Sequence, residues 1–196
     1  MLGEIFTTMI ANLSAYLKSK APGTYEPITY GSISQLNEPG YESLKGKIVM
    51  GLVNIEEDRI SRRPDNYVRT PDPVYKKSPV YLNLYVLFVA NFDPANPATY
   101  TNSLDCIEGI VRYFQQQNVF TPANTPNLPT EVEELIFDLK TLSFQDMNNL
   151  WGVLGSKYLP SVLYKVRLVR IDDIFTSGAV PLIEQIYINE QNLETA

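Results

Sequence analysis

Histidine is absent from this sequence of 196 residues, and cysteine occurs only once. Without histidine the chain lacks the general base of serine and cysteine hydrolases and the most common protein ligand of zinc. The single cysteine, Cys106, excludes an internal disulfide, and its place in a helical pattern of apolar residues predicts a packed thiol rather than a nucleophile. We therefore expect neither an enzyme nor a cofactor.

Long apolar runs and an excess of positive charge are also missing. No run approaches the ~20 apolar residues of a membrane-spanning helix, and residues 1–20 lack the basic start and cleavage site of a secretion signal. Sixteen basic against 22 acidic residues give a net charge of −6, which argues against binding nucleic acid through its phosphates. We expect no membrane and no nucleic acid among the partners.

Hydrophobic periodicity, in contrast, is clear along most of the chain. It predicts helices over residues 2–18, 99–117 and 144–154, and strands over residues 47–60, 79–92, 133–142 and 162–171, with a further short strand near residues 28–33. Residues 79–92 are apolar on both faces, as in a central strand covered on both sides. The order of elements predicts an α/β (α+β) fold with a single mixed, mostly antiparallel sheet and helices packed on it.

The same patterns predict how individual segments pack. Apolar positions that we expect to point inward lie in the second helix (Tyr100, Leu104) and in the last helix (Trp151). In the strand 133–142, one side carries Leu135, Phe137 and Leu139. In the strand 162–171, strict alternation places Val169 on the face opposite to Tyr164 and Val166. The proline-spaced segment 118–131 is expected to lie over the surface as a loop.

Two glycines, Gly152 and Gly155, precede Ser156 and Lys157 in a way that resembles a phosphate-binding loop. Such a loop needs four residues between its glycines, the order Gly-Lys-Ser/Thr, and a place between a strand and a helix. Here two residues separate the glycines, and the segment follows a predicted helix whose start at Ser143 has the spacing of a capping box. We therefore interpret Gly155 as the residue that ends this helix.

Charge is unevenly distributed along the chain. Residues 59–78 hold six basic and two acidic side chains, a net charge of +4, so that the rest of the chain carries −10. This separation favours docking of the loop of one copy on an acidic surface of a neighbour. Together with an apolar corner after Gly155, the candidate contact residues are Arg59, Arg62, Arg63, Tyr67, Arg69, Tyr75, Lys76, Lys77, Tyr158 and Leu159.

Carboxylates cluster at two predicted strand ends, at residues 56–58 and 172–173. Oxygen ligands of this kind suit Ca²⁺ or Mg²⁺, but neither cluster has the spacing of a dedicated calcium loop, so solvated strand ends are the simpler interpretation. An enzyme that uses Glu56 and Glu57, or Asp172 and Asp173, is an alternative without a visible second catalytic partner. A ligand-binding module with a closed apolar pocket is another alternative.

Three segments resemble a known family: "YLNLYVLFVANF", "IVRYFQQQNVFTP" and "LIFDLKTLSFQDMNNLWGVLGSKYLPSVLYKVRLVRI". They are similar to the cap, or tail (tube) terminator, proteins of contractile injection systems such as the antifeeding prophage and the Photorhabdus virulence cassettes. The resemblance runs from about residue 5 to residue 173 and is strongest in the last segment. It is weaker in the basic loop and in the arm after Asp173.

The resemblance implies a structural protein without active-site residues. Its expected role is to form a ring of six copies that ends the inner tube and anchors the last ring of the sheath. The implied partners are the chain itself, the tube protein and the sheath protein, with assembly in the bacterial cytoplasm into a particle that can leave the cell. We expect one terminator-like domain over residues 1–173, which includes the basic loop 59–79, and a C-terminal arm over residues 174–196. The alternative is a structural adaptor at the baseplate end of the same particle.

Overall fold

The fold is described from a computed structural model of the chain. By contacts between residues the chain divides into two units: Met1–Ser61 with Val80–Ile171, and Arg62–Pro79 with Asp172–Ala196. The residues that the structure describes are 2–20, 28–36, 38–58, 67–68, 74–75, 80–93 and 95–171.

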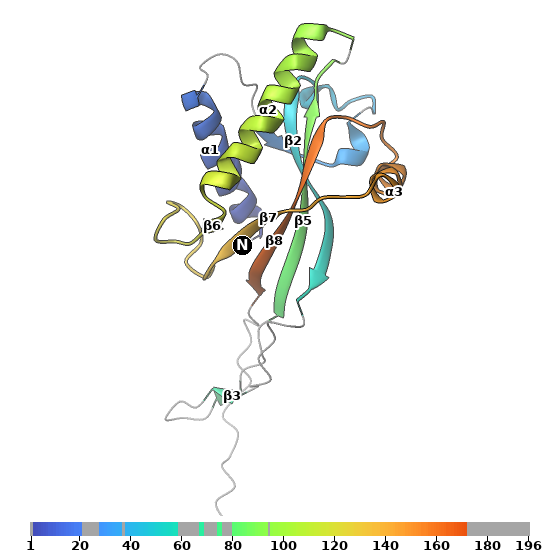
Figure 1. Ribbon diagram of the computed structural model, residues 1–196. Coiled ribbons are helices and arrows are strands. Elements are labelled where there is room, and N and C mark those ends of the chain that lie inside the picture. The colour runs from blue at the N-terminus through green and yellow to red at the C-terminus, as the bar shows by residue number, and fades with distance from the viewer. Residues whose placement is uncertain are drawn as a thin grey trace, which may run out of the picture. The chain divides into compact units, whose positions relative to one another are not determined.

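The first unit is built on a sheet of six strands (Figure 1). In spatial order the strands are β1 (Ile28–Tyr30), β2 (Lys47–Glu57), β5 (Val80–Asn91), β8 (Ser161–Ile171), β7 (Leu135–Leu139) and β6 (Val119–Phe120). The pair β1–β2 is parallel, and every other neighbouring pair is antiparallel. The predicted α/β class with a mixed, mostly antiparallel sheet is therefore confirmed.

Helices cover both faces of this sheet. The helices α1 (Leu2–Lys20) and α2 (Pro97–Gln116) lie side by side on one face, and α3 (Phe144–Leu154) lies on the other (Figure 1). Two short 3-10 helices, η1 (Ile33–Gln35) and η2 (Glu42–Leu44), pack on the same side as α3. Side-chain caps explain where α2 and α3 start. At the start of α2, Asn96 Oδ1 accepts the Ala98 N–H (3.0 Å), and at the start of α3, Ser143 Oγ accepts the Asp146 N–H (3.1 Å).

The core under α1 and α2 is rich in aromatic side chains. Phe114 of α2 stacks on Phe137 of β7, with ring centroids 4.5 Å apart, and also contacts Phe88 and Tyr164. The helix α1 adds an apolar stripe at four-residue spacing, formed by Ile5, Met9, Leu13 and Leu17. Aromatic contacts of this kind each stabilise a core by about 0.5–1.5 kcal/mol beyond the burial of their area.

The core on the opposite face is smaller. It joins Val49, Leu87, Val89 and Leu163 of the sheet to Trp151 of α3 and to the two 3-10 helices. The central strand β5 therefore contributes to both cores, as its two apolar faces predicted. The predicted burial of Trp151 is also confirmed, since the side chain is 6% exposed.

Two irregularities change which face of the sheet a residue occupies. In β8, three positions separate Val166 from Val169, but their partners Leu84 and Leu82 on β5 are only two positions apart. The extra residue returns Val169 to the face of Tyr164 and Val166, where it is buried in the α1–α2 core. The predicted alternation was therefore wrong at Val169. A similar shift in β2 lies between Leu52 and Asn54.

The segment 118–131 is a loop from residue 121 onward, as its prolines predicted, but it does not lie only over the surface. Its start forms β6, and the side chains of Phe120, Thr125 and Leu128 are buried in the core region. The Thr8 hydroxyl of α1 donates to the Asn127 carbonyl (2.9 Å), which fixes the segment against the helix. Conversely, Tyr100 and Leu104, which were predicted to point inward, are 43% and 46% exposed. Leu139, which was predicted to share one side of its strand with Leu135 and Phe137, is 54% exposed although those two side chains are buried.

Candidate assembly surfaces

The basic loop is described only in part. Its strands β3 (Tyr67–Val68) and β4 (Val74–Tyr75) pair antiparallel, with Tyr67 opposite Tyr75. The side chains of both tyrosines are not described. The other loop residues that were predicted to make contacts lie outside the described residues: Arg59, Arg62, Arg63, Arg69, Lys76 and Lys77. Their role in contacts therefore stays a prediction.

The corner after α3 has the geometry that its sequence predicts for a helix end. Gly155 has φ 65° and ψ 16°, and its N–H donates to the Gly152 carbonyl (3.2 Å). A left-handed residue of this kind closes a helix at little steric cost when it is glycine. The two glycines therefore belong to a helix terminus and not to a phosphate-binding loop.

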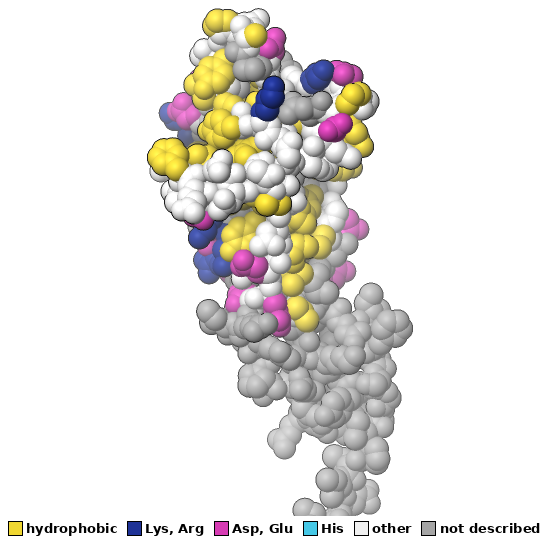
Figure 2. Space-filling view, turned by 90° about the vertical axis from the view of Figure 1, so that its right-hand side faces the viewer, with side chains coloured by type: hydrophobic (Ala, Val, Ile, Leu, Met, Phe, Trp, Pro, Cys, Tyr) yellow, Lys and Arg dark blue, Asp and Glu magenta, His cyan; other side chains and the backbone are white. Residues whose placement is uncertain are grey.

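Tyr158 and Leu159, the predicted contact residues of this corner, differ in exposure. The rings of Tyr158 and Trp151 meet edge to face, with centroids 5.7 Å apart, yet 60% of Tyr158 is exposed. Leu159 is half-buried against the Trp151 core. Further exposed apolar side chains in α3 are Phe144 (88%) and Val153 (87%), and Figure 2 views the molecule from this side, where hydrophobic side chains lie in several separate groups.

The carboxylates at the end of β2 are engaged by neighbouring side chains. The Tyr85 hydroxyl donates to Glu56 Oε2 (2.9 Å), and burial of the ring, followed by this hydrogen bond and the charge of Glu56, raises the pKa of Tyr85. Among the residues that the structure describes, no three His, Cys, Asp or Glu side chains are grouped closely enough to hold a metal ion. Asp172 and Asp173 lie outside those residues.

A surface that the sequence did not predict lies at the outer edge of β2. This strand has 11 residues, but β1 has three and pairs only with Ile48–Met50. The chain leaves the edge at Gly31, whose N–H donates to the Met50 carbonyl (3.1 Å), and continues into η1 on the other face. Beyond this point the described part of the chain places no strand against the outer side of β2.

Gly51 explains why the edge becomes open at this position. A Cβ atom on Gly51 would lie 2.5 Å from Ile33 Cδ1 and 3.1 Å from the Gly31 carbonyl oxygen. The absence of a side chain thus lets Ile33 cross β2 closely and reach the smaller core, where it is buried. After the crossing, apolar side chains of β2 are left in solvent, with Leu52 42% and Ile55 48% exposed.

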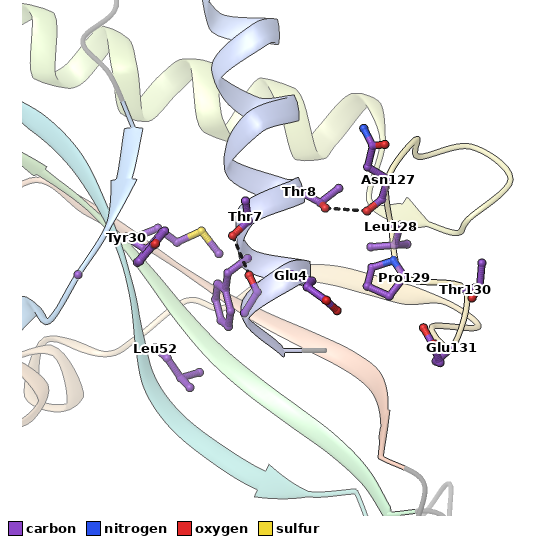
Figure 3. Close-up of a pocket in the computed structure, with 14 residues that line it drawn as sticks. Glu4, Thr7, Thr8, Tyr30, Leu52, Asn127, Leu128, Pro129, Thr130 and Glu131 are labelled. Carbon is purple, nitrogen blue, oxygen red and sulfur yellow. Dashed lines mark hydrogen bonds between the residues drawn. The ribbon is translucent and has the colours of Figure 1, made fainter. Parts of the chain in front are cut away.

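A groove of about 1050 Å³ adjoins this edge (Figure 3). Its walls are the first turns of α1, the segment 127–131, and four residues of the sheet edge: Tyr30, Gly31, Met50 and Leu52. Apolar side chains on the wall include Phe6, Met50 and Leu52, and charged ones are Glu4 and Glu131. No lysine or arginine is among the residues that line it.

No local sequence signal marks the edge or the groove. Residues 48–53 contain no polar side chain, as in a strand that is buried throughout, and the exposure of Leu52 depends on the length of β1 and on the crossing of Ile33. Both are tertiary features. In the described residues, none of the helices has the length and apolar character required to cross a membrane.

Comparisons with known proteins give matches to one family and to solved structures, whereas no curated protein matches the sequence. The Pvc16 N-terminal domain family matches residues 4–185. A PVC sheath/tube terminator in its extended state, from a cryo-EM structure of an extracellular contractile injection system, has a TM-score of 0.59 and 16% identity over 100% of this chain. The tube-terminating cap of the anti-feeding prophage has a TM-score of 0.61 and 13% identity over 94% of this chain. The matched regions cover 65% and 60% of those longer chains, and at these identities the likeness establishes the fold.

Proposed function

The chain belongs to the family of the Pvc16 N-terminal domain, and from this premise we propose that it is a structural terminator of a contractile injection system. The family match over residues 4–185 carries the proposal. The fold adds support, because two structures that resemble it are a sheath/tube terminator and a tube-terminating cap.

Termination has a simple physical requirement. A tube of stacked rings always ends in a face equal to the one that was just covered, so head-to-tail growth continues without a stop. A ring ends growth when one of its faces fits the tube and the other face does not. We propose that copies of this chain, six in number, form such a ring on the last tube ring and hold the last sheath ring.

The partners of this function are further copies of the chain, the tube protein and the sheath protein. We propose that the basic loop 59–79, Tyr158 and Leu159 contact these partners, and that assembly takes place in the bacterial cytoplasm before the particle is released. A catalytic role, or contact with nucleic acid or a membrane, is not part of this proposal. The acidic net charge of −6 supports the exclusion of nucleic acid.

Deletion of the gene tests the terminator role. Particles purified from the deletion strain should have tubes of variable length, or tubes without sheath, in electron micrographs, and expression of the intact chain should restore a uniform length. Tubes of normal and uniform length in the deletion strain would contradict the role. In that case the adaptor at the baseplate end becomes the better assignment.

A further inference from the structure

The open edge of β2 is equipped to pair with an added strand. The Met50 carbonyl faces the outer side, because it accepts from Gly31, and alternation of the backbone turns the N–H and C=O of Leu52 to the same side. An edge with unpaired backbone groups is a template for another extended chain. Further along, the Ile55 N–H is protected by a local bond to Asn54 Oδ1 (2.9 Å), so the available stretch is short.

The side chains around this edge define the chemistry of its occupant. Tyr30 (64% exposed), Leu52 and Ile55 offer apolar contacts. Glu4 and Glu131 line the adjoining groove, and Glu56 and Glu57 lie further along β2. An extended segment that carries both apolar side chains and positive charges is complementary to this surface.

Three segments of a second copy are possible occupants, and charge separates them. The C-terminal residues 172–196 contain five acidic and no basic side chains, so the glutamates would repel them. A second β2 edge would bring Glu56 and Glu57 of both copies close together. Residues 59–79 carry a net charge of +4, so the glutamates would attract them. They also contain the paired strands β3 and β4, each of which consists of one valine and one tyrosine.

We propose that the edge of β2 beyond Met50, with the adjoining acidic groove, receives the basic loop 59–79 of a second copy of this chain. The inference rests on the self-assembly in the proposed function and names the two surfaces that meet. Each copy carries one loop and one groove, so the contact is head-to-tail and closes into a ring when the rotation per copy permits. Its electrostatic part weakens as added salt screens the charges.

Charge reversal on both sides of the contact tests the pairing. The loop variant is Arg62→Glu/Arg63→Glu/Arg69→Glu, and the groove variant is Glu4→Lys/Glu131→Lys. The matched control for the groove variant is Glu38→Lys/Asp105→Lys, which makes the same change in charge at two exposed residues outside the groove. Self-association of the full chain is measured by sedimentation at low and at high salt.

We expect the loop variant and the groove variant each to weaken self-association at least tenfold, and the control to leave it within about twofold. A mixture of the loop variant and the groove variant should associate again, because the reversed charges then attract each other. An unchanged groove variant, a control that is equally impaired, a mixture without recovery, or a wild-type chain that stays monomeric would each overturn the proposal.

Disulfide cross-linking identifies the contact directly. The native Cys106 is fully buried, so that introduced cysteines dominate the oxidation products. Chains with Leu52→Cys, mixed with chains with Tyr67→Cys, should form a covalent dimer under mild oxidation, whereas Leu139→Cys, at another exposed position, should not. Equal yields with Leu52→Cys and Leu139→Cys would contradict the assignment. Since this readout uses purified chain alone, it is independent of where the chain lies in a particle.

Discussion

One face of the sheet is covered by two long helices over a large aromatic core, and the other by the single short helix α3 and two 3-10 turns. Under α1 and α2, the core joins residues from every strand of the six-stranded sheet. On the opposite face, α3 buries only Trp151, while Phe144 and Val153 are almost fully exposed. We therefore expect the first face to supply most of the stability of the unit. The second face keeps apolar side chains available for contacts.

The largest effect is expected from a cavity in the aromatic core. Phe114→Ala removes a ring that contacts five other rings, and we expect a loss of about 3–5 kcal/mol in the free energy of unfolding. Chemical denaturation followed by circular dichroism measures it. A loss below about 1 kcal/mol would mean that this face does not dominate stability.

A smaller loss is expected on the opposite face. Trp151→Ala empties the centre of the smaller core, and we expect the free energy of unfolding to fall by about 3 kcal/mol. This loss is at the low end of the range for large aromatic side chains, because few other buried groups surround Trp151. The same denaturation experiment compares the two variants. If Trp151→Ala costs more than Phe114→Ala, the contrast between the two faces is wrong.

Two glycines of α3 provide a matched pair at the end of the helix. Gly155→Ala forces a Cβ into the left-handed conformation and should cost about 1–2 kcal/mol. Gly152 is helical and a Cβ there meets no atom within 4 Å, so Gly152→Ala should stabilise by up to about 1 kcal/mol. The thermal unfolding midpoints should therefore move in opposite directions. A shift of the same sign in both variants would refute the helix-end assignment.

The smallest effect on stability is expected from the buried phenols of Tyr113 and Tyr164. It is absent at neutral pH and develops only in alkaline solution. Burial raises the pKa of Tyr113 and of Tyr164 from 10.0 to about 12. Above pH 10 the unfolded chain releases these protons while the folded chain retains them, so stability falls as the pH rises from 10 to 12. The variant Tyr113→Phe/Tyr164→Phe should lose less stability over this interval in urea titrations at each pH. An equal fall in both proteins would show that other groups cause it.

The sequence predicted those parts of the fold that depend on local periodicity. The helices, the long strands and the double-sided β5 each have an apolar pattern over ten or more residues, and the capping residue Ser143 was found by its spacing. The segment 118–131 has no such period. Its burial depends on tertiary contacts such as the bond between Thr8 and Asn127, which lie 119 positions apart.

Other features follow from how strands meet and cannot be seen in one strand alone. The extra residue of β8 that returns Val169 to the larger core is defined only against Leu82 and Leu84 of β5. The open edge of β2 is set by the crossing of Ile33 over Gly51. For the same reason the candidate groove was missed, whereas the apolar corner at Tyr158 was predicted from its place directly after the helix end at Gly155.

Locating the chain on intact particles tests the terminator assignment most directly. Averaged cryo-EM images of particles that carry a labelled copy of the chain would give its position along the tube and its rotational symmetry. The account predicts a ring of density on the last tube ring, at the end opposite the baseplate and in contact with the last sheath ring. Density at the baseplate end, or along the whole tube, would contradict it.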